Sequence, residues 1–238
     1  MAVQEKRITE YVTEYYGGGE HPKDSNTTLY RYRLDRIWDS AKKPLLVIGC
    51  NPSTATAEKL DPTMLKVMEI ARDNGYGGVI MCNLYSYRET NPNEMKKAAR
   101  KHGFDYIIGR QNETVLMQAA EKYGFRGADD VVFAYGNIGV TGWKDINGKG
   151  VNDEALQHAI ELMVRIRSEK SKNVWAFALT DKGQPRHPLK IKNNMKANWI
   201  NLIDYYLLDN ICPEVPPIDQ DADDDDDNDD EDGDINMD

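Results

Sequence analysis

The sequence has few of the features that mark a membrane, secreted or metal-binding protein. Its 238 residues contain no run near the roughly 18 apolar residues that a membrane helix needs, and residues 1–10 are too polar for a secretory signal. The three cysteines (Cys50, Cys82 and Cys212) form no C-x-x-C pair, so they indicate neither a zinc site nor a disulfide framework. We therefore expect three thiols, no metal, no membrane association and a cytoplasmic location.

Basic residues are absent from the end of the chain. Residues 219–238 hold thirteen Asp or Glu and no Lys or Arg, and removing these thirteen from the net charge of -10 leaves +3 for residues 1–218. Such a segment cannot bury enough apolar surface to offset its ordering entropy, so we expect residues 213–238 to form a disordered acidic tail. The tail is either a solubilising appendage or a polyanion that competes for a cationic groove of the same chain or docks on a protein partner.

Four apolar segments alternate with helical ones. The expected strands cover residues 44–50, 78–84, 130–135 and 173–180. The expected helices begin at Asp61-Pro62, span much of 93–123, and cover 153–168 and 195–208. This order predicts an α/β fold, a three-layer sandwich around a central four-stranded parallel sheet.

The first 28 residues lie outside this alternation. Residues 5–16 read as a short helix that Gly17, Gly18 and Gly19 end, and residues 29–34 read as an additional strand with one wet face. The expected organisation is an N-terminal helical extension over 1–28, one α/β domain over 29–212 and the tail over 213–238.

The ligand crevice of a parallel sheet lies beyond the carboxyl ends of its strands. The first strand is followed by Asn51-Pro52-Ser53, which has neither the phosphate-binding loop spacing nor the dinucleotide fingerprint, so we expect no cofactor. The amide of Asn51 and the hydroxyl of Ser53 can orient a water or contact a base edge. The alternative is a turn that only caps the next helix.

The second strand ends at Asn83, whose amide can pair with the polar edge of a pyrimidine or merely cap a turn. Tyr85, Tyr87 and Arg88 follow in the loop, a combination that suits base stacking and phosphate contact. A surface salt bridge is the alternative for Arg88.

The loops after the third and fourth strands carry the remaining candidates. The third strand is followed by Gly136 and Asn137, and the fourth by Gln184, Arg186 and His187. On a loop that prolines restrain, an imidazole can donate a hydrogen bond to an oxygen that gains negative charge. The other histidines have no such setting and are expected at the surface: His21, His102 and His158.

Taken together, these loops resemble motifs of the uracil-DNA glycosylase superfamily. Residues 48–53 resemble the Gly-x-Asn-Pro-Gly motif of its mismatch-specific branch, and residues 81–84 are similar to the strand with the base-reading asparagine of the uracil-specific branch. Residues 132–137 are similar to the third strand of that branch, and residues 186–189 to its histidine-proline loop. The sequence departs from the superfamily at Asn51, where the most active branch has aspartate, and at Ser53, which replaces a glycine.

More specific sequence motifs identify the chain as similar to the family called domain of unknown function 1643, which is frequent in bacteria and their phages. These words are Tyr30-Arg31-Tyr32 to Trp38, Asn51-Pro52-Ser53-Thr54-Ala55, Asp61-Pro62-Thr63, Gly75-Tyr76-Gly77-Gly78, Asn83-Leu84 and Gly183-Gln184-Pro185-Arg186-His187-Pro188. That family's name implies no activity, so the expected chemistry follows the glycosylase resemblance.

The resemblance implies a protein that binds or hydrolyses at the N-glycosidic bond of a flipped base in DNA or a nucleotide, modified bases included. Asn51 and His187 would be catalytic, without a metal. The residues expected to contact the base are Ser53, Asn83, Tyr85, Tyr87, Gly136, Asn137 and Gln184. The residues expected to hold phosphates are Arg31, Arg33, Arg88, Arg186, Lys190 and Lys192. The alternatives are a non-catalytic DNA or nucleotide binding module, and a protein that acts on a host factor through its acidic tail.

Overall fold

The computed structural model describes residues 11–21, 24–53, 55–56, 59–89, 91–121, 129–137, 152–170 and 172–208. The predicted acidic tail, Cys212 and residues 5–10 of the expected N-terminal helix lie outside these ranges. The two other cysteines, Cys50 and Cys82, are free thiols as expected.

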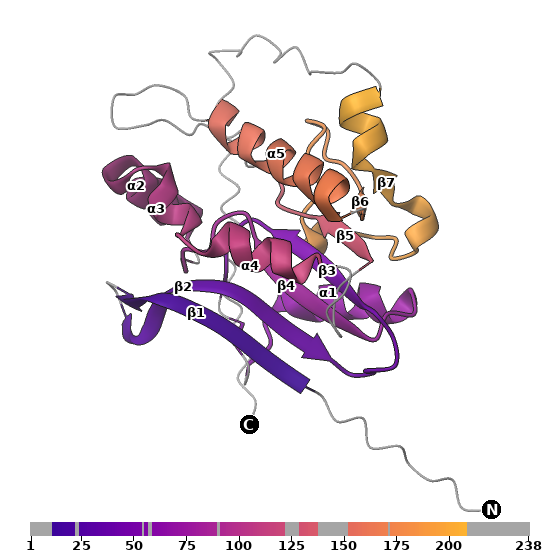
Figure 1. Ribbon diagram of the computed structural model, residues 1–238, viewed down its shortest axis with the longest axis horizontal. Helices are drawn as coiled ribbons and strands as arrows, with labels where there is room; N and C mark the ends of the chain where they lie inside the picture. The colour runs from indigo at the N-terminus through magenta and orange to yellow at the C-terminus, as the bar shows by residue number, and fades with distance from the viewer. Residues whose placement is uncertain are drawn as a thin grey trace, which may run out of the picture.

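The chain forms a mixed α/β fold around one seven-stranded sheet (Figure 1). The strands are β1 Tyr11–His21, β2 Asp24–Ile37, β3 Pro44–Gly49, β4 Gly78–Asn83, β5 Asp130–Phe133, β6 Asn173–Ala176 and β7 Ile200–Asn201. Their order across the sheet is β1-β2-β4-β3-β5-β6-β7. The pairs β3/β4, β3/β5 and β5/β6 are parallel, whereas β1/β2, β2/β4 and β6/β7 are antiparallel. The sheet is therefore mixed in direction.

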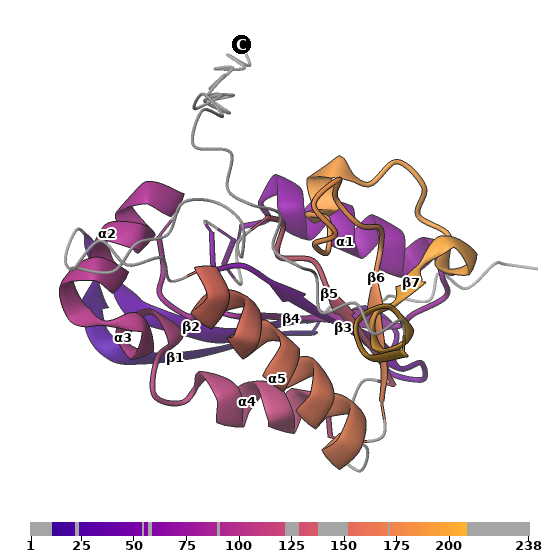
Figure 2. The same ribbon diagram turned by 90° about the horizontal axis from the view of Figure 1, so that it is seen from above.

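Helices cover both faces of this sheet (Figure 2). They are α1 Pro62–Asp73, α2 Pro92–His102, α3 Phe104–Ile108, α4 Asn112–Ala119 and α5 Asn152–Lys170, with short 3-10 or π turns η2 Pro188–Lys190, η3 Lys196–Asn198 and η4 Asp204–Leu208. In the view from above, α1 lies on one side of the sheet, and α4 and α5 lie on the other. Asp61 caps α1 as predicted, since its carboxylate accepts the Met64 backbone N–H at 2.7 Å.

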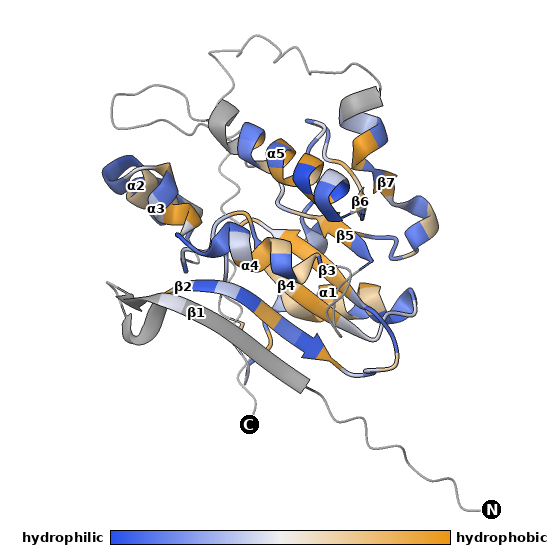
Figure 3. Cartoon of the chain, viewed as in Figure 1, coloured by the Kyte–Doolittle hydropathy of each residue, from blue (hydrophilic) through white to orange (hydrophobic). Residues whose placement is uncertain are grey.

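The apolar strands lie at the centre of the fold, where hydrophobic colours gather in Figure 3. Every residue of β3, β4 and β5 is buried. The side chains of these strands divide between two clusters, one against α4 and α5 and the other against α1. A strand covered on both faces needs apolar residues at successive positions, which explains the uninterrupted apolar runs in the sequence.

The predicted N-terminal helix is wrong where the structure describes it. Residues 11–16 belong to β1, which pairs antiparallel with β2 along most of its length. Tyr11, Val12, Thr13, Tyr15 and Tyr16 are β-branched or aromatic residues that favour a strand once a partner strand is available. The strand expected at 29–34 is longer than predicted and lies between β1 and β4.

The predicted C-terminal helix over 195–208 is also mostly wrong. The segment contains η3, the short strand β7 and finally η4. β7 pairs with β6 on the side away from β5, so the sheet gains an antiparallel strand there. The backbone pairing available next to β6 outweighs the helical spacing of Trp199, Leu202 and Ile203.

A buried carboxylate holds the C-terminal segment against the sheet. Asp130 is 7% exposed, and its oxygens accept hydrogen bonds from Lys196 Nζ at 2.6 Å, Tyr76 Oη at 2.7 Å and Trp175 Nε1 at 2.9 Å. Lys196 Nζ also lies 5.6 to 6.0 Å from the ring centroids of Tyr76, Trp175 and Trp199. These contacts join β5, β6 and η3 through one ion pair and its aromatic surroundings.

Asp130→Asn is expected to destabilise the protein by about 2 kcal/mol at pH 7, because charge-assisted hydrogen bonds are lost. Burial alone would raise the pKa of Asp130, but the hydrogen bonds from Lys196, Tyr76 and Trp175 outweigh it and lower the pKa. The stabilisation is therefore present above the unfolded value of about 3.9 and disappears as pH falls through the lower folded value. Urea unfolding at pH 7 and at decreasing pH measures it.

The matched control is Asp181→Asn. Asp181 is an exposed aspartate in the turn that follows Thr180. We expect its loss to change stability by less than about 0.5 kcal/mol, as is usual for a surface substitution. Equal effects of the two substitutions would contradict a special role for the Asp130 cluster.

Candidate functional site

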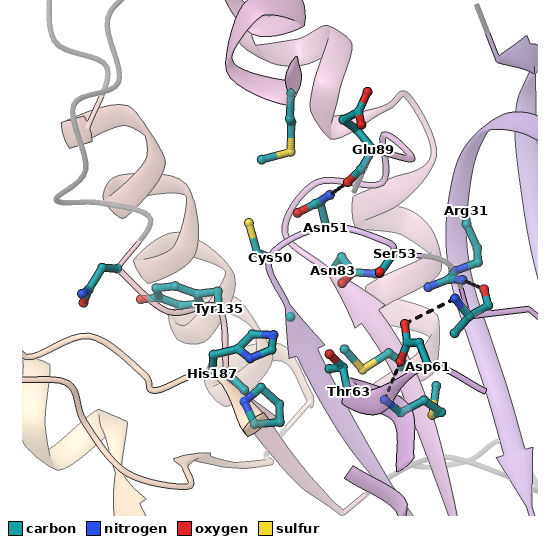
Figure 4. Close-up of a pocket in the computed structure, with 18 of the residues that line it drawn as sticks. Arg31, Cys50, Asn51, Ser53, Asp61, Thr63, Asn83, Glu89, Tyr135 and His187 are labelled. Carbon is teal, nitrogen blue, oxygen red and sulfur yellow. Dashed lines mark hydrogen bonds between the residues drawn. The ribbon is translucent and has the colours of Figure 1, made fainter. Parts of the chain in front are cut away.

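A cavity of about 360 Å³ lies beyond the carboxyl ends of β3, β4 and β5 (Figure 4). It is bordered by the segments that follow β3, β4 and β5, by the loop before η2, and by residues of β2, α1 and α2. Six of the residues predicted for the site line it: Arg31, Asn51, Ser53, Asn83, Asn137 and His187. Residues from distant parts of the sequence therefore meet at one place, as parallel strands with a common carboxyl edge require.

The side-chain amide of Asn51 is held in place by two hydrogen bonds to the backbone. Its Nδ2 donates to the backbone carbonyl of Glu89 and more weakly to that of Pro52, at 3.4 Å. Both contacts use the nitrogen, so the side-chain oxygen is left as an acceptor, and Asn51 lines the cavity (Figure 4). An amide oxygen can accept a hydrogen bond from a water or a ligand N–H, but it is a poor proton acceptor.

Asn83, at the end of β4, is 1% exposed. With its Nδ2 turned toward the backbone carbonyls of Cys82 and Asn51, each 3.3 Å away, the amide donates to both of them. Its Oδ1 then remains as an acceptor within the cavity lining. Gly49 makes room for this arrangement, because a Cβ at position 49 would lie 2.9 Å from the Asn83 amide and 2.8 Å from Met81 Cε.

His187 precedes η2 and presents a neutral imidazole. Its Nδ1 accepts the backbone N–H of Leu189 at 3.4 Å, so the proton of the neutral ring lies on Nε2. Burial lowers the pKa of His187, while Asp61 opposes this shift and Lys190 adds to it. His187 is therefore uncharged at pH 7, and its Nε2–H can donate to a ligand in the cavity that it lines.

The first turn of α1 adds groups that the sequence analysis did not assign to the site. Asp61 and Thr63 line the cavity. The Asp61 carboxylate accepts backbone N–H groups of Met64 at 2.7 Å and Ala55 at 3.3 Å (Figure 4). The capping motif signalled a helix start but gave no sign that this start lies beside His187.

Cys50 and Lys96 form a further part of the lining that sequence reasoning missed. Burial raises the pKa of Cys50 to about 12, although Lys96 opposes the shift, so the thiol is neutral and not a nucleophile at pH 7. Burial lowers the pKa of Lys96, Arg100 lowers it further, and Cys50 opposes them. No sequence motif marks Lys96, which comes from the middle of α2.

The aromatic residue at the cavity is Tyr135, not Tyr85 or Tyr87. Tyr85 is fully buried in the core, edge-on to Phe104 with ring centroids 5.3 Å apart, and Tyr87 is 5% exposed and packs against Tyr30. Neither residue lines the cavity, whereas Tyr135 does. The structure does not bring Tyr85 and Tyr87 to the cavity, because this loop pairs with β2 and its rings pack in the core.

Gly136 and Gln184 contact the loop of His187 outside the cavity lining. The Gly136 N–H donates to the carbonyl of Pro185 at 2.8 Å, and Gly136 has a φ of 73°, which favours glycine. Gln184 is 3% exposed, and its Oε1 accepts a hydrogen bond from the Tyr135 hydroxyl at 3.4 Å. These two residues were expected to touch a base, but they lie outside the cavity lining and instead fix the loop that carries His187.

The predicted phosphate-binding residues divide into internal and exposed groups. Arg31 lines the cavity, but it is only 3% exposed and donates a hydrogen bond to the Ala55 carbonyl. Arg33 forms a two-point ion pair with Asp35, with Nε 2.6 Å from Oδ1 and Nη2 2.7 Å from Oδ2. Arg186 donates through Nε to the Leu179 carbonyl at 3.0 Å. This partly buried ion pair engages the guanidinium group of Arg33 within the protein. The remaining candidates lie outside the cavity lining, Arg88 half-buried and Lys190 and Lys192 exposed.

His158 was expected at the surface, and this is wrong. Its ring lies 6.4 Å from that of Tyr85 in a stacked arrangement, and its Nε2 is buried. Burial lowers the pKa of His158, against the opposing effect of a backbone hydrogen bond at Leu84. His102 is exposed, as expected.

Residues 31–189 match the family described as "Protein of unknown function (DUF1643)". The chain belongs to this family. The DUF1643 match begins within β2 and ends within η2, and so includes the carboxyl ends of β3, β4 and β5 that border the cavity. No curated protein and no solved structure matches the chain.

Within the described ranges of this DUF1643 protein, no three His, Cys, Asp or Glu side chains are placed to hold a metal ion. The same residues include no helix that combines the length and the apolar character needed to cross a bilayer.

Proposed function

We propose that this protein recognises a flipped base of a nucleic acid and binds or hydrolyses at its N-glycosidic bond. The observation that carries the proposal is that Asn51, Asn83 and His187 line one cavity, although they are spread over more than half of the chain. Two amide acceptors and one neutral imidazole donor complement the mixed donors and acceptors of a base edge. The cavity volume falls within the range of small-molecule sites.

The proposed roles follow from the atoms that each side chain presents. Asn83 Oδ1 accepts from a base N–H, and the ring of Tyr135 gives the base an aromatic neighbour. Asn51 Oδ1 orients a water, whose oxygen bonds to the anomeric carbon as the C–N bond breaks. The bonding electron pair leaves with the base, and a proton from the water ends on the base or in solvent. His187 Nε2–H stabilises the negative charge that develops on a base oxygen.

The resemblance to the uracil-DNA glycosylase superfamily supports this reaction type and a glycosylase-like arrangement of the parallel strands. The resemblance covers short motifs, and the cavity lined by Asn51, Asn83 and His187 carries the proposal. Lys190 and Lys192 are exposed residues that follow His187 in the chain. We propose that they contact phosphates outside the cavity.

A binding module without catalysis is the second candidate, and the acid-base inventory favours it. Position 51 carries an amide, and the Asp61 carboxylate in the lining already accepts two backbone N–H bonds. These bonds engage both carboxylate oxygens, Oδ1 with Met64 and Oδ2 with Ala55, and hold the group as the cap of α1. Binding and hydrolysis therefore need separate measurements.

The deciding experiment combines base release and affinity on the same oligonucleotides. Single- and double-stranded DNA containing uracil, hydroxymethyluracil or the normal bases is incubated with the full chain, and free base and abasic sites are quantified. We expect the parent protein to release free base, and we expect Asn51→Ala to abolish this release. Affinity for the oligonucleotides without any abasic product would establish the binding module instead. If the protein neither binds any of these oligonucleotides nor releases a base from them, both proposed functions are overturned.

A further inference from the structure

One wall of the cavity is apolar, and the base-recognition proposal does not use it. Four lining residues belong to the hydrophobic cluster that packs against α1: Ala55, Met64, Met81 and Ala134. We propose that Met81 determines which base the cavity accepts, and that it favours a pyrimidine with a small apolar substituent on C5. This inference rests on the proposed function, and it adds the class of base.

The register of the sheet places Met81 beside the amide of Asn83. The two residues are two positions apart on β4, so their side chains leave the same face of the sheet. Gly49 lies opposite Asn83 on the neighbouring strand β3. A Cβ at position 49 would lie 2.8 Å from Met81 Cε and 2.9 Å from the Asn83 amide. The methyl end of Met81 therefore lies next to the Asn83 amide, over the space that Gly49 leaves.

Met81 keeps some exposure where its neighbours on β4 have none. It is 8% exposed and lines the cavity, whereas Ile80 and Cys82 are fully buried and do not line it. A pyrimidine that donates an N–H to Asn83 Oδ1 would bring the adjoining edge of its ring toward the Met81 methyl group. An apolar group on that edge gains by leaving water, whereas a polar one loses its water and finds no partner on a thioether side chain.

The cavity also has room for a substituent. Its volume of about 360 Å³ corresponds to about 12 water molecules at roughly 30 Å³ each, which is more than a bare pyrimidine ring fills. Methionine is unbranched and has three rotatable bonds, so Met81 and Met64 can adjust to an added methyl group by changing rotamer, without a shift of the backbone. This wall of the cavity therefore suits a methyl-sized apolar group better than a bare C–H edge.

The test measures how affinity depends on the substituent. Single-stranded oligonucleotides differ only at one nucleotide, which carries uracil, thymine, 5-hydroxymethyluracil, 5-ethyluracil or no base, on a 2′-fluorinated sugar that prevents base release during the measurement. We expect the full-length protein to bind the thymine oligonucleotide about 4-fold more tightly than the uracil one, the usual gain for one buried methyl group, and the hydroxymethyluracil one no more tightly than uracil. In Met81→Ala the preference for thymine over uracil should fall below about twofold, and 5-ethyluracil should gain relative to thymine, because the shortened side chain leaves space.

The matched control is Met68→Ala, which removes the same atoms from the same hydrophobic cluster at a residue that is 3% exposed and outside the cavity lining. It should keep the thymine-to-uracil ratio of the parent, because a ratio of two affinities does not depend on the fraction of folded protein. Suppose that the parent binds uracil at least as tightly as thymine, or that both variants change the ratio equally, while the oligonucleotide without a base binds more weakly. Base recognition then stands, and the role of Met81 is overturned. If the missing base makes no difference, or no oligonucleotide binds, the proposed function and this inference both fail.

Discussion

Replacing His187 by alanine is expected to reduce the rate of base release by about 100- to 1,000-fold, the usual cost of losing one preorganised donor to a developing oxyanion. The Leu189 N–H on Nδ1 fixes the ring tautomer, so Nε2–H is ready to donate before the substrate arrives. Affinity for the intact oligonucleotide should fall much less, since the charge on the base develops only in the transition state. Single-turnover rates and equilibrium binding on the same substrate measure the two effects.

The control is His102→Ala, which removes an exposed imidazole on α2 that stacks on Tyr106 with ring centroids 4.5 Å apart. We expect its rate to stay within threefold of the parent. Because His187 also caps η2, thermal unfolding of each variant must be recorded to exclude a loss of folded protein. An unchanged rate in folded His187→Ala would remove the imidazole from the mechanism.

The pH profile follows from the same imidazole. Burial lowers the pKa of His187 below its usual value of about 6.5, so the ring is neutral throughout the range from pH 7 upward. A neutral donor predicts a rate that does not change with the titration of His187 between pH 7 and 9. At lower pH, protonation of Nδ1 would break its bond with the Leu189 N–H, so stability should fall as pH drops below about 6.5.

The central strands could be predicted because burial on both faces requires continuous apolar runs. Residues 44–50, 78–84 and 130–135 have such runs and contain β3, β4 and β5. The ends of the chain could not be predicted in this way. Residues 11–16 and 195–208 have spacings compatible with a helix, and strand pairing with β2 and β6 decided their structure.

The site was predictable to the extent that it lies at strand ends. Asn51 and Asn83 directly follow or end buried strands, so the topology places their side chains at one edge of the sheet. Tyr85 and Tyr87 also come shortly after a buried strand, but the sequence alone does not show that their loop returns into the core. Lys96 comes from a helix whose position over the cavity depends on tertiary packing, and no local pattern reports that position.

Asn83→Ala is expected to weaken binding of the base by about 5- to 150-fold. The substitution removes the Oδ1 acceptor from a buried site, and an unpaired polar group of a bound base costs about 1–3 kcal/mol. Affinities of nucleoside and oligonucleotide should fall together, because the amide contacts the base and not the phosphate. The matched control is Asn93→Ala, an exposed asparagine on α2, which should bind as the parent does.

Gly49→Ala tests the same amide without changing it. The added methyl group would lie 2.9 Å from the Asn83 amide and 2.8 Å from Met81 Cε, too close for these side chains to keep their positions. We expect Gly49→Ala to weaken base binding in the same direction as Asn83→Ala, and the double variant to lose less than the product of the two single losses, because both act on one contact. Independent, multiplicative losses would show that Gly49 affects the cavity by another route. Unchanged binding in folded Asn83→Ala would show that this amide does not contact the base.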